Sequence, residues 1–345
     1  MPVGGYALVA AYLKGSEAKT IGSEHIDQVA RASSIEDILN ITRNTDIGKY
    51  LEGVAAKTFD DFDSALWLYF SGCITSLRGL QPIPKDVTRL LEAYISKYDI
   101  LNIKAVLQGL QLGKKARSIP VGIIFNCGLL DELFATENID EVIGLLNRCR
   151  LGNYAALVGS YREDDSIKST LIIEAALNTE YFMNLLDVIR KVKDGSILRR
   201  VLGITIDLIN LQTVLRATIT DNKTNIPESI IGGGYIISDQ LIRELLSTPL
   251  TELTGKLENT PYYRILQDVI SSYELSKNIA AIDEVIERNR FLLAKEMLST
   301  HVLSLVAVLW YLIIKEVELR NLRIIIKGML DNLSFNDTRR YLVTS

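Results

Sequence analysis

The sequence predicts an all-α protein built from three similar helical units. A helix signature occurs three times in the 345 residues, as YDILNIKAVLQGL (98–110), IDLINLQTVLRAT (206–218) and VELRNLRIIIKGM (317–329). Within each copy the apolar residues recur at helical spacing, and sustained strand alternation is found nowhere in the chain. The copies are 108 and 111 residues apart, about a third of the chain, which indicates domain-sized units rather than a short solenoid repeat.

A second segment repeats ahead of this helix in each copy. It reads SIEDILNITRNTDIGKYL (34–51), NIDEVIGLLNRCRLGNYAAL (138–157) and PLTELTGKLENTPYYRIL (249–266). The intervals from the last leucine of each segment to the asparagine of the repeated helix are 51, 53 and 55 residues. This near-constant spacing predicts that each unit carries the same pair of helical elements.

Prolines separate the copies. Pro120 and Pro227 each follow a repeated helix and precede an aspartate, Asp131 or Asp239, that begins a new helical stretch. A proline disfavours helix at the residue before it, so we expect the helices to end near these points. We therefore predict three helical repeat units over residues 1–115, 116–224 and 225–345. The glycines at 232–234 extend the second break, where we expect a flexible linker; the alternative is a run that holds an anion through its backbone amides.

The acid and the asparagine of the repeated helix are the polar positions nearest its apolar stripe. The acid lies on the margin of the buried face, three residues before the asparagine. A partly buried carboxylate is costly unless it is hydrogen-bonded. We predict that these residues tie the helix to a neighbouring helix of its own unit; the alternative is a proton-carrying or ligand-binding role. The structural repeat positions are Asp99, Asn102, Asp207, Asn210, Glu318 and Asn321.

One apolar run, from Val302 to Ile314, invites comparison with a membrane span. It is interrupted only by Ser304 and is bounded by His301 and Lys315. A spanning helix needs roughly 20 apolar residues, and this run is shorter. We predict a helix buried in a protein core.

Composition and motifs predict no catalytic, cofactor-binding or metal site. The chain has 38 basic and 42 acidic residues, which argues against a generally basic nucleic-acid surface. Neither of the two histidines has a metal-ligand spacing, and GxxxxGK[ST] is absent. The three cysteines have no CxxC pairing, which favours a reducing compartment. Acidic clusters at 60–63 and 163–165 leave open an all-α enzyme that binds a diphosphate through magnesium, but neither places its carboxylates on one helix face.

Three stretches of the chain resemble the C subunit of the archaeal-type (A/V-type) rotary ATP synthase, which is related to the d subunit of the vacuolar ATPase. They are EVELRNLRIIIKGM (316–329), LENTPYYRIL (257–266) and ESIIGGGYI (228–236). The resemblance implies three helical units in a pseudo-threefold funnel, peripheral on the cytoplasmic face of the membrane. It implies that the chain is a non-catalytic rotor subunit.

In that family the funnel receives the central axle, subunits D and F, and sits on the membrane proteolipid rotor ring. The resemblance thus implies coupling between proton or sodium transport and ATP synthesis or hydrolysis, with no nucleotide, nucleic acid or cofactor bound by this chain. The alternative interpretation of the repeat is a cytosolic helical-repeat adaptor protein.

Overall fold

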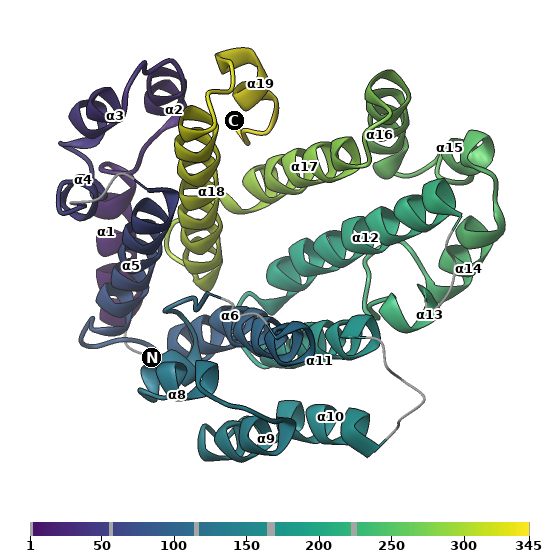
Figure 1. Cartoon of the computed structure of the whole chain (residues 1–345), viewed down its shortest axis with the longest axis horizontal. Coiled ribbons are helices and arrows are strands. Elements are labelled where there is room, and N and C mark those ends of the chain that lie inside the picture. Colours follow the sequence, from purple (N-terminus) through teal and green to yellow (C-terminus); the bar gives the residue numbers. More distant parts are fainter. Residues whose placement is uncertain (1–2, 55–57, 114–116, 164–169, 222–225, 345) are drawn as a thin grey trace. The chain divides into compact units, whose positions relative to one another are not determined.

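The computed structural model describes residues 3–54, 58–113, 117–163, 170–221 and 226–344. Throughout these ranges the regular secondary structure is helical, so the predicted all-α class is confirmed (Figure 1). The boundaries predicted at 115/116 and 224/225 lie outside the described residues. The division into three repeat units therefore stays a prediction.

By its contacts the chain divides into two compact units. One comprises residues 1–88 and 287–345, and the other residues 89–286. The divisions fall inside two helices, α6 (Lys85–Leu112) and α17 (Ala280–Leu298). The first unit is thus assembled from both ends of the chain.

The first unit is built around α18 (Leu305–Leu330), which packs against α5 (Phe59–Arg78) and α1 (Val3–Glu17) (Figure 1). Its core includes Tyr69 and Tyr311, which are almost completely buried. The predicted buried helix at 302–314 is confirmed from Leu305 onward, whereas Val302 and Leu303 precede the helix and are exposed. The shorter helices of this unit are α2 (Ser23–Ala30), α3 (Ile35–Thr42), α4 (Gly48–Leu51) and α19 (Phe335–Arg340).

The second unit contains two long helices of the repeated signature, α6 and α12 (Gly195–Thr220). Helix α11 (Thr170–Arg190) packs against α12. The remaining helices are α7 (Ile123–Asn126), α8 (Leu130–Phe134), α9 (Ile139–Arg148), α10 (Gly152–Glu163), α13 (Ile226–Ser229), α14 (Asp239–Ser247), η1 (Leu250–Glu252), α15 (Leu253–Lys256) and α16 (Tyr262–Ser276).

The acids of the earlier repeated segment begin helices. Ser34 caps α3 by accepting a hydrogen bond from the backbone N–H of Asp37, and the Asp37 carboxylate accepts one from the N–H of Ser33. In the second copy Asn138 caps α9 through Glu141, whose carboxylate accepts from the N–H of Glu137. In both copies the cap satisfies an N–H group that has no partner inside the helix, and the acid three residues later binds the N–H of the residue before the cap.

One helix among the described residues, α12, is long and apolar enough to cross a membrane by length and composition. Of its most apolar window, 61% is buried inside the protein, as in the core helix of a soluble domain.

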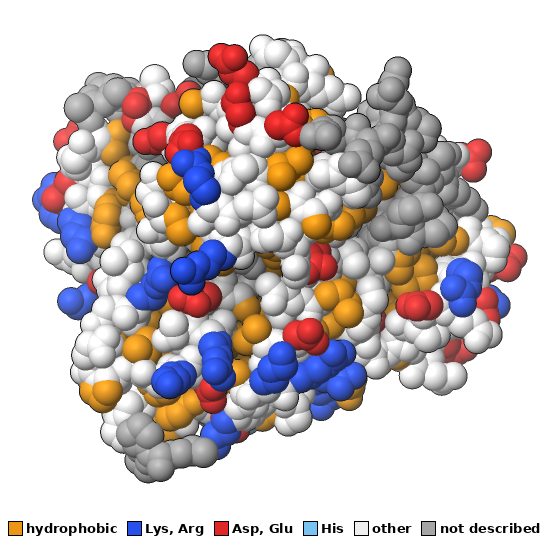
Figure 2. All heavy atoms as spheres, turned by 90° about the horizontal axis from the view of Figure 1, so that it is seen from below, with side chains coloured by type: hydrophobic (Ala, Val, Ile, Leu, Met, Phe, Trp, Pro, Cys, Tyr) orange, Lys and Arg blue, Asp and Glu red, His pale blue; other side chains and the backbone are white. Residues whose placement is uncertain are grey.

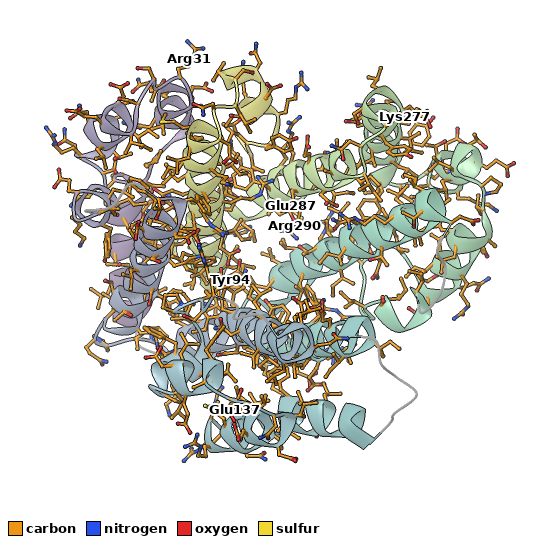
Figure 3. All side chains as sticks on the ribbon, in the orientation of Figure 1. Arg31, Tyr94, Glu137, Lys277, Glu287 and Arg290 are labelled. Carbon is orange, nitrogen blue, oxygen red and sulfur yellow. The ribbon has the colours of Figure 1, made fainter. Side chains whose placement is uncertain are left out.

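The surface carries both charges. Figure 2 shows acidic and basic side chains interspersed over one face, with apolar side chains between them. Some charged side chains pair within one helix: Glu287 and Arg290, one turn apart on α17, form an ion pair of 2.7 Å (Figure 3). Such half-exposed pairs stabilise a helix only slightly.

Candidate functional site

The six repeat positions are buried polar groups on three long helices. Asp99 and Asn102 lie on α6, Asp207 and Asn210 on α12, and Glu318 and Asn321 on α18, and none is more than 3% exposed. They lie deeper than the margin of the apolar stripe that the sequence predicts. Buried polar groups at this depth require hydrogen-bond partners.

Each asparagine holds one residue of backbone by both of its polar groups. The amide of Asn102 donates to the carbonyl of Ile119 at 2.9 Å and accepts from the N–H of Ile119 at 2.8 Å. Asn210 binds Ile231 in the same way at 2.8 and 2.9 Å, and Asn321 binds Val343 at 2.7 and 3.0 Å. An amide can donate and accept together, which a carboxylate or an aliphatic side chain of this size cannot do.

In the first two copies the acid binds backbone N–H groups that lie a few residues beyond the residue held by its asparagine. Asp99 accepts from the N–H groups of Ile123 and Ile124 at 2.7 and 2.8 Å. Asp207 accepts from three successive N–H groups, those of residues 235–237, at 2.8 to 3.3 Å, and from the hydroxyl of Tyr262 at 2.7 Å. We call each acid, its asparagine and the backbone that they bind a clasp.

The third clasp binds the two ends of the chain. Glu318 accepts from the N–H of Ile21 at 2.8 Å, although 297 residues separate them. Asn321 of the same helix holds Val343 near the C-terminal end. The third clasp therefore joins the N-terminal and C-terminal segments to α18.

The predicted partner of these residues was wrong. The acid and the asparagine bind mainly the backbone of the segment that follows the helix, not a neighbouring helix of the same predicted unit. The physical reason is that loop N–H and C=O groups have no helical partner and must be satisfied when the loop is buried.

The glycine run at 232–234 is not simply the flexible linker that the sequence suggested. A Cβ at Gly234 would lie 2.0 Å from Oδ1 of Asp207, and one at Gly233 would lie 2.6 Å from the Leu186 side chain. Gly233 also has a φ of +93°, which glycine adopts readily. The run is therefore the close-fitting part of the second clasp, and only Gly232 faces open space.

We expect Gly234→Ala to lower the free energy of unfolding by about 1–3 kcal/mol, because the methyl group displaces the Asp207 carboxylate. Gly232→Ala is the matched control, since a Cβ there meets nothing within 4 Å. Denaturant unfolding of the two variants makes the comparison. Equal stability of the two variants would contradict the close fit.

The polar side of each repeated helix contacts a second long helix. Lys104 donates to Asn178 of α11 at 2.7 Å, and Gln212 donates to Asp283 of α17 at 2.5 Å. In the third copy Arg323 pairs with Asp63 of α5. Each clasped helix is thus also fixed along its polar side, two residues after the asparagine.

Lys315 is a buried cation whose burial the sequence does not predict. Its side chain is fully buried, and its Nζ donates to Glu318 at 2.9 Å, to the hydroxyl of Tyr69 at 2.6 Å and to Thr20 at 2.7 Å. The signal in the sequence is its position three residues before Glu318, at the end of the apolar run. Together these contacts link α18 to α5 and to the segment after α1.

Burial raises the pKa of the acid in the first clasp. Desolvation raises the pKa of Asp99 to about 7, against the opposing effect of the two N–H donors. Desolvation also raises the pKa of Asp207 and that of Tyr69, whose hydroxyl donates to Glu318 beside the third clasp. The folded protein therefore favours the protonated form of Asp99 more than the unfolded chain does.

A raised carboxyl pKa has a definite sign for stability. The contribution of Asp99 is fully present below its unfolded pKa, about 4, and is lost as the pH rises to about 7. We expect the unfolding free energy of the native chain, relative to Asp99→Asn, to fall by a few kcal/mol over this range. Denaturant melts at pH 4.5 and 7.5 measure the difference. A difference that is constant with pH would contradict the shifted pKa.

Metal-binding groups are not assembled in the part of the chain that the structure describes. No group of three or more His, Cys, Asp or Glu side chains is placed there to hold a metal ion. In the second acidic cluster of the sequence, residues 164 and 165 lie outside the described residues. What the described residues assemble is a set of three clasps, which fix the paths of loops against long helices.

Comparison with known proteins gives a consistent result over nearly the whole chain. The family model described as ATP synthase (C/AC39) subunit matches residues 9–341. The C subunit of the A-type ATP synthase of Methanocaldococcus jannaschii is 26% identical over 98% of this chain and 86% of its own length. Its namesakes in Methanococcoides burtonii and Pyrococcus abyssi are 25% and 22% identical, over 98% and 95% of this chain and 94% and 87% of their own lengths.

Proposed function

The chain belongs to the ATP synthase (C/AC39) subunit family, and from this premise we propose that it is the rotor socket of an A/V-type ATP synthase. In this role it joins the central axle, subunits D and F, to the membrane proteolipid ring. It couples proton or sodium transport to ATP synthesis or hydrolysis and carries out no catalysis itself. We place it peripherally, on the cytoplasmic face of the membrane.

The match of the family model over residues 9–341 is the observation that carries this proposal. The relatives are named as subunits of an A-type ATP synthase, and we extend that assembly to this chain. We also propose that the three repeat units form a pseudo-threefold funnel whose cavity receives the axle.

The clasps support the mechanical part of the proposal. A part that transmits torque must resist bending, which packed helices with fixed connections do better than free loops. Each of the three long helices is held at its acid, at its asparagine and along its polar side. Because these hydrogen bonds are mostly buried, water does not compete for them as it does at a surface.

A binding experiment with the purified chain tests the proposal. Detergent-solubilised proteolipid ring and purified D–F axle are each offered to the immobilised chain, with ovalbumin as a control. We expect both to bind specifically. Binding of neither by a chain that is folded and helical by circular dichroism would contradict the socket and favour the helical-repeat adaptor.

The relative strength of the two joints is a second part of the proposal. The soluble head can detach from the membrane part only if the axle joint is the weaker one. Salt screens charges at exposed interfaces. In a salt titration of the assembled complex we expect the axle to separate from this chain first; prior release of the ring would reverse the assignment.

A further inference from the structure

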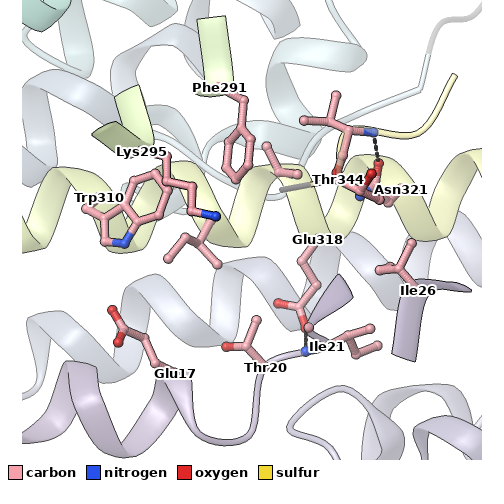
Figure 4. Close-up of a pocket in the computed structure, with 14 residues that line it drawn as sticks. Glu17, Thr20, Ile21, Ile26, Phe291, Lys295, Trp310, Glu318, Asn321 and Thr344 are labelled. Carbon is pink, nitrogen blue, oxygen red and sulfur yellow. Dashed lines mark hydrogen bonds between the residues drawn. The ribbon is translucent and has the colours of Figure 1, made fainter. Parts of the chain in front are cut away.

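A pocket opens beside the third clasp. It has a volume of about 270 Å³ and lies between α17 and α18 (Figure 4). Ile21, from the segment after α1, and Val343, from the segment after α19, lie on its border. The wall from α18 contains Trp310, Ile314 and Val317, and that from α17 contains Phe291 and Lys295. The rings of Phe291 and Trp310 stack at 5.6 Å and form an apolar surface.

In the second copy the corresponding helix positions are covered by the chain itself. Counted from the asparagine, Ile314, Val317 and Glu318 correspond to Gly203, Ile206 and Asp207. A Cβ at Gly203 would lie 3.0 Å from Tyr235, and one at Gly233 would lie 3.9 Å from Ile206. The segment 233–235 therefore lies over positions that line the open pocket in the third copy.

The third copy differs because its clasp holds two separate segments. In the second copy, continuous backbone runs from Ile231, bound by the asparagine, to residues 235–237, bound by the acid. In the third copy the asparagine binds Val343 and the acid binds Ile21, which lie near opposite ends of the chain. The pocket lies where these two ends meet α18.

We propose that this pocket binds an extended segment of a partner protein, in the place that residues 233–235 occupy in the second copy. The volume is near the lower end of the range for ligand pockets, which suits one or two side chains of a peptide better than a cofactor. The inference concerns a separate site and does not depend on the rotor role.

Charge specifies the segment further. Lys295 is half-buried at the pocket, and among the described residues its amino group has no ion pair or hydrogen bond, whereas Glu17 at the border is paired with Lys14 at 2.6 Å. A carboxylate on the ligand would form an ion pair with the amino group of Lys295, and an apolar side chain would cover Phe291 and Trp310. The segment that fits is therefore acidic and apolar in adjacent positions.

The test uses the full chain and two peptides. One peptide has the sequence of Ser229–Asp239, SIIGGGYIISD, and the other carries Gly232→Glu, at the position where a side chain meets nothing in the second copy. With Trp67→Phe as background, Trp310 is the remaining tryptophan and reports on the pocket by its fluorescence. We expect saturable changes with both peptides, and at least fivefold tighter binding of the acidic one.

Variants of the chain locate the binding. Lys295→Glu should lower the affinity for the acidic peptide at least tenfold and should raise the affinity for a peptide with Gly232→Lys. Lys256→Glu, an exposed control on α15, should change neither affinity more than twofold. Val317→Phe should abolish binding by filling the pocket, with an unchanged melting temperature showing that it folds. Absence of saturable binding, or binding indifferent to Lys295→Glu and Val317→Phe, would overturn the proposal. So would a dimer in sedimentation that Val317→Phe dissociates, because the occupant would then be a second copy of this chain.

Discussion

Asn210→Leu should lower the free energy of unfolding by about 2–5 kcal/mol. The substitution removes both hydrogen bonds to Ile231 and leaves a buried N–H and a buried carbonyl without partners. Each such group costs about 1–3 kcal/mol, and Asn210 is only 1% exposed, so water cannot readily replace the amide. Guanidinium unfolding followed by circular dichroism measures the change.

A matched control distinguishes the loss of the clasp from the general effect of replacing an asparagine by leucine. Asn147 is exposed on α9, so Asn147→Leu should change the stability by less than about 0.5 kcal/mol. Hydrogen exchange at the N–H of Ile231 adds a local measurement, and its protection should fall in Asn210→Leu. If Asn210→Leu were as stable as the control, the clasp would contribute nothing to the fold.

Lys315→Met should be the most destabilising of the substitutions considered, at about 3–5 kcal/mol. Removing one partner of a buried ion pair leaves the other charge without compensation. Here the charge is that of Glu318, which is 3% exposed and would retain only Ile21 and Tyr69 as donors. Thermal and denaturant unfolding should both show the loss.

The double variant Lys315→Met/Glu318→Gln shows whether the charge is the cause. Glutamine retains an acceptor for Ile21 and carries no charge, so the double variant should be more stable than Lys315→Met alone. A double variant with the summed losses of the two single ones would attribute the effect to packing. The cycle therefore distinguishes the ion pair from the loss of volume.

The sequence predicts which residues form the clasps but not which residues they hold. The acid and the asparagine repeat at a fixed spacing on an apolar helix, so their position beside the buried face follows from periodicity, whereas their full burial does not. Ile119, Ile231 and Val343 are bound through backbone atoms, and backbone contacts leave little trace in side-chain identity. The pairing of Glu318 with Ile21 is harder still, because it depends on where the two chain ends come together in the fold.

The same limit explains why the sequence does not predict the burial of Lys315 or the close fit of the glycines at 232–234. A lysine at the end of an apolar helix normally extends to solvent, and here its burial depends on the Glu318 carboxylate and on the hydroxyls of Tyr69 and Thr20. The glycines at 232–234 have the composition of a linker. Their close contact with Asp207 and Leu186 appears only when the loop is placed against two helices.

Reconstitution tests whether the chain couples the axle to the ring. The synthase is assembled in liposomes with and without this protein, and ATP hydrolysis and ATP-driven ion uptake are measured together. We predict that omission abolishes uptake while the soluble head still hydrolyses ATP, and that adding the purified chain restores uptake. Uptake coupled to hydrolysis in its absence would contradict the account.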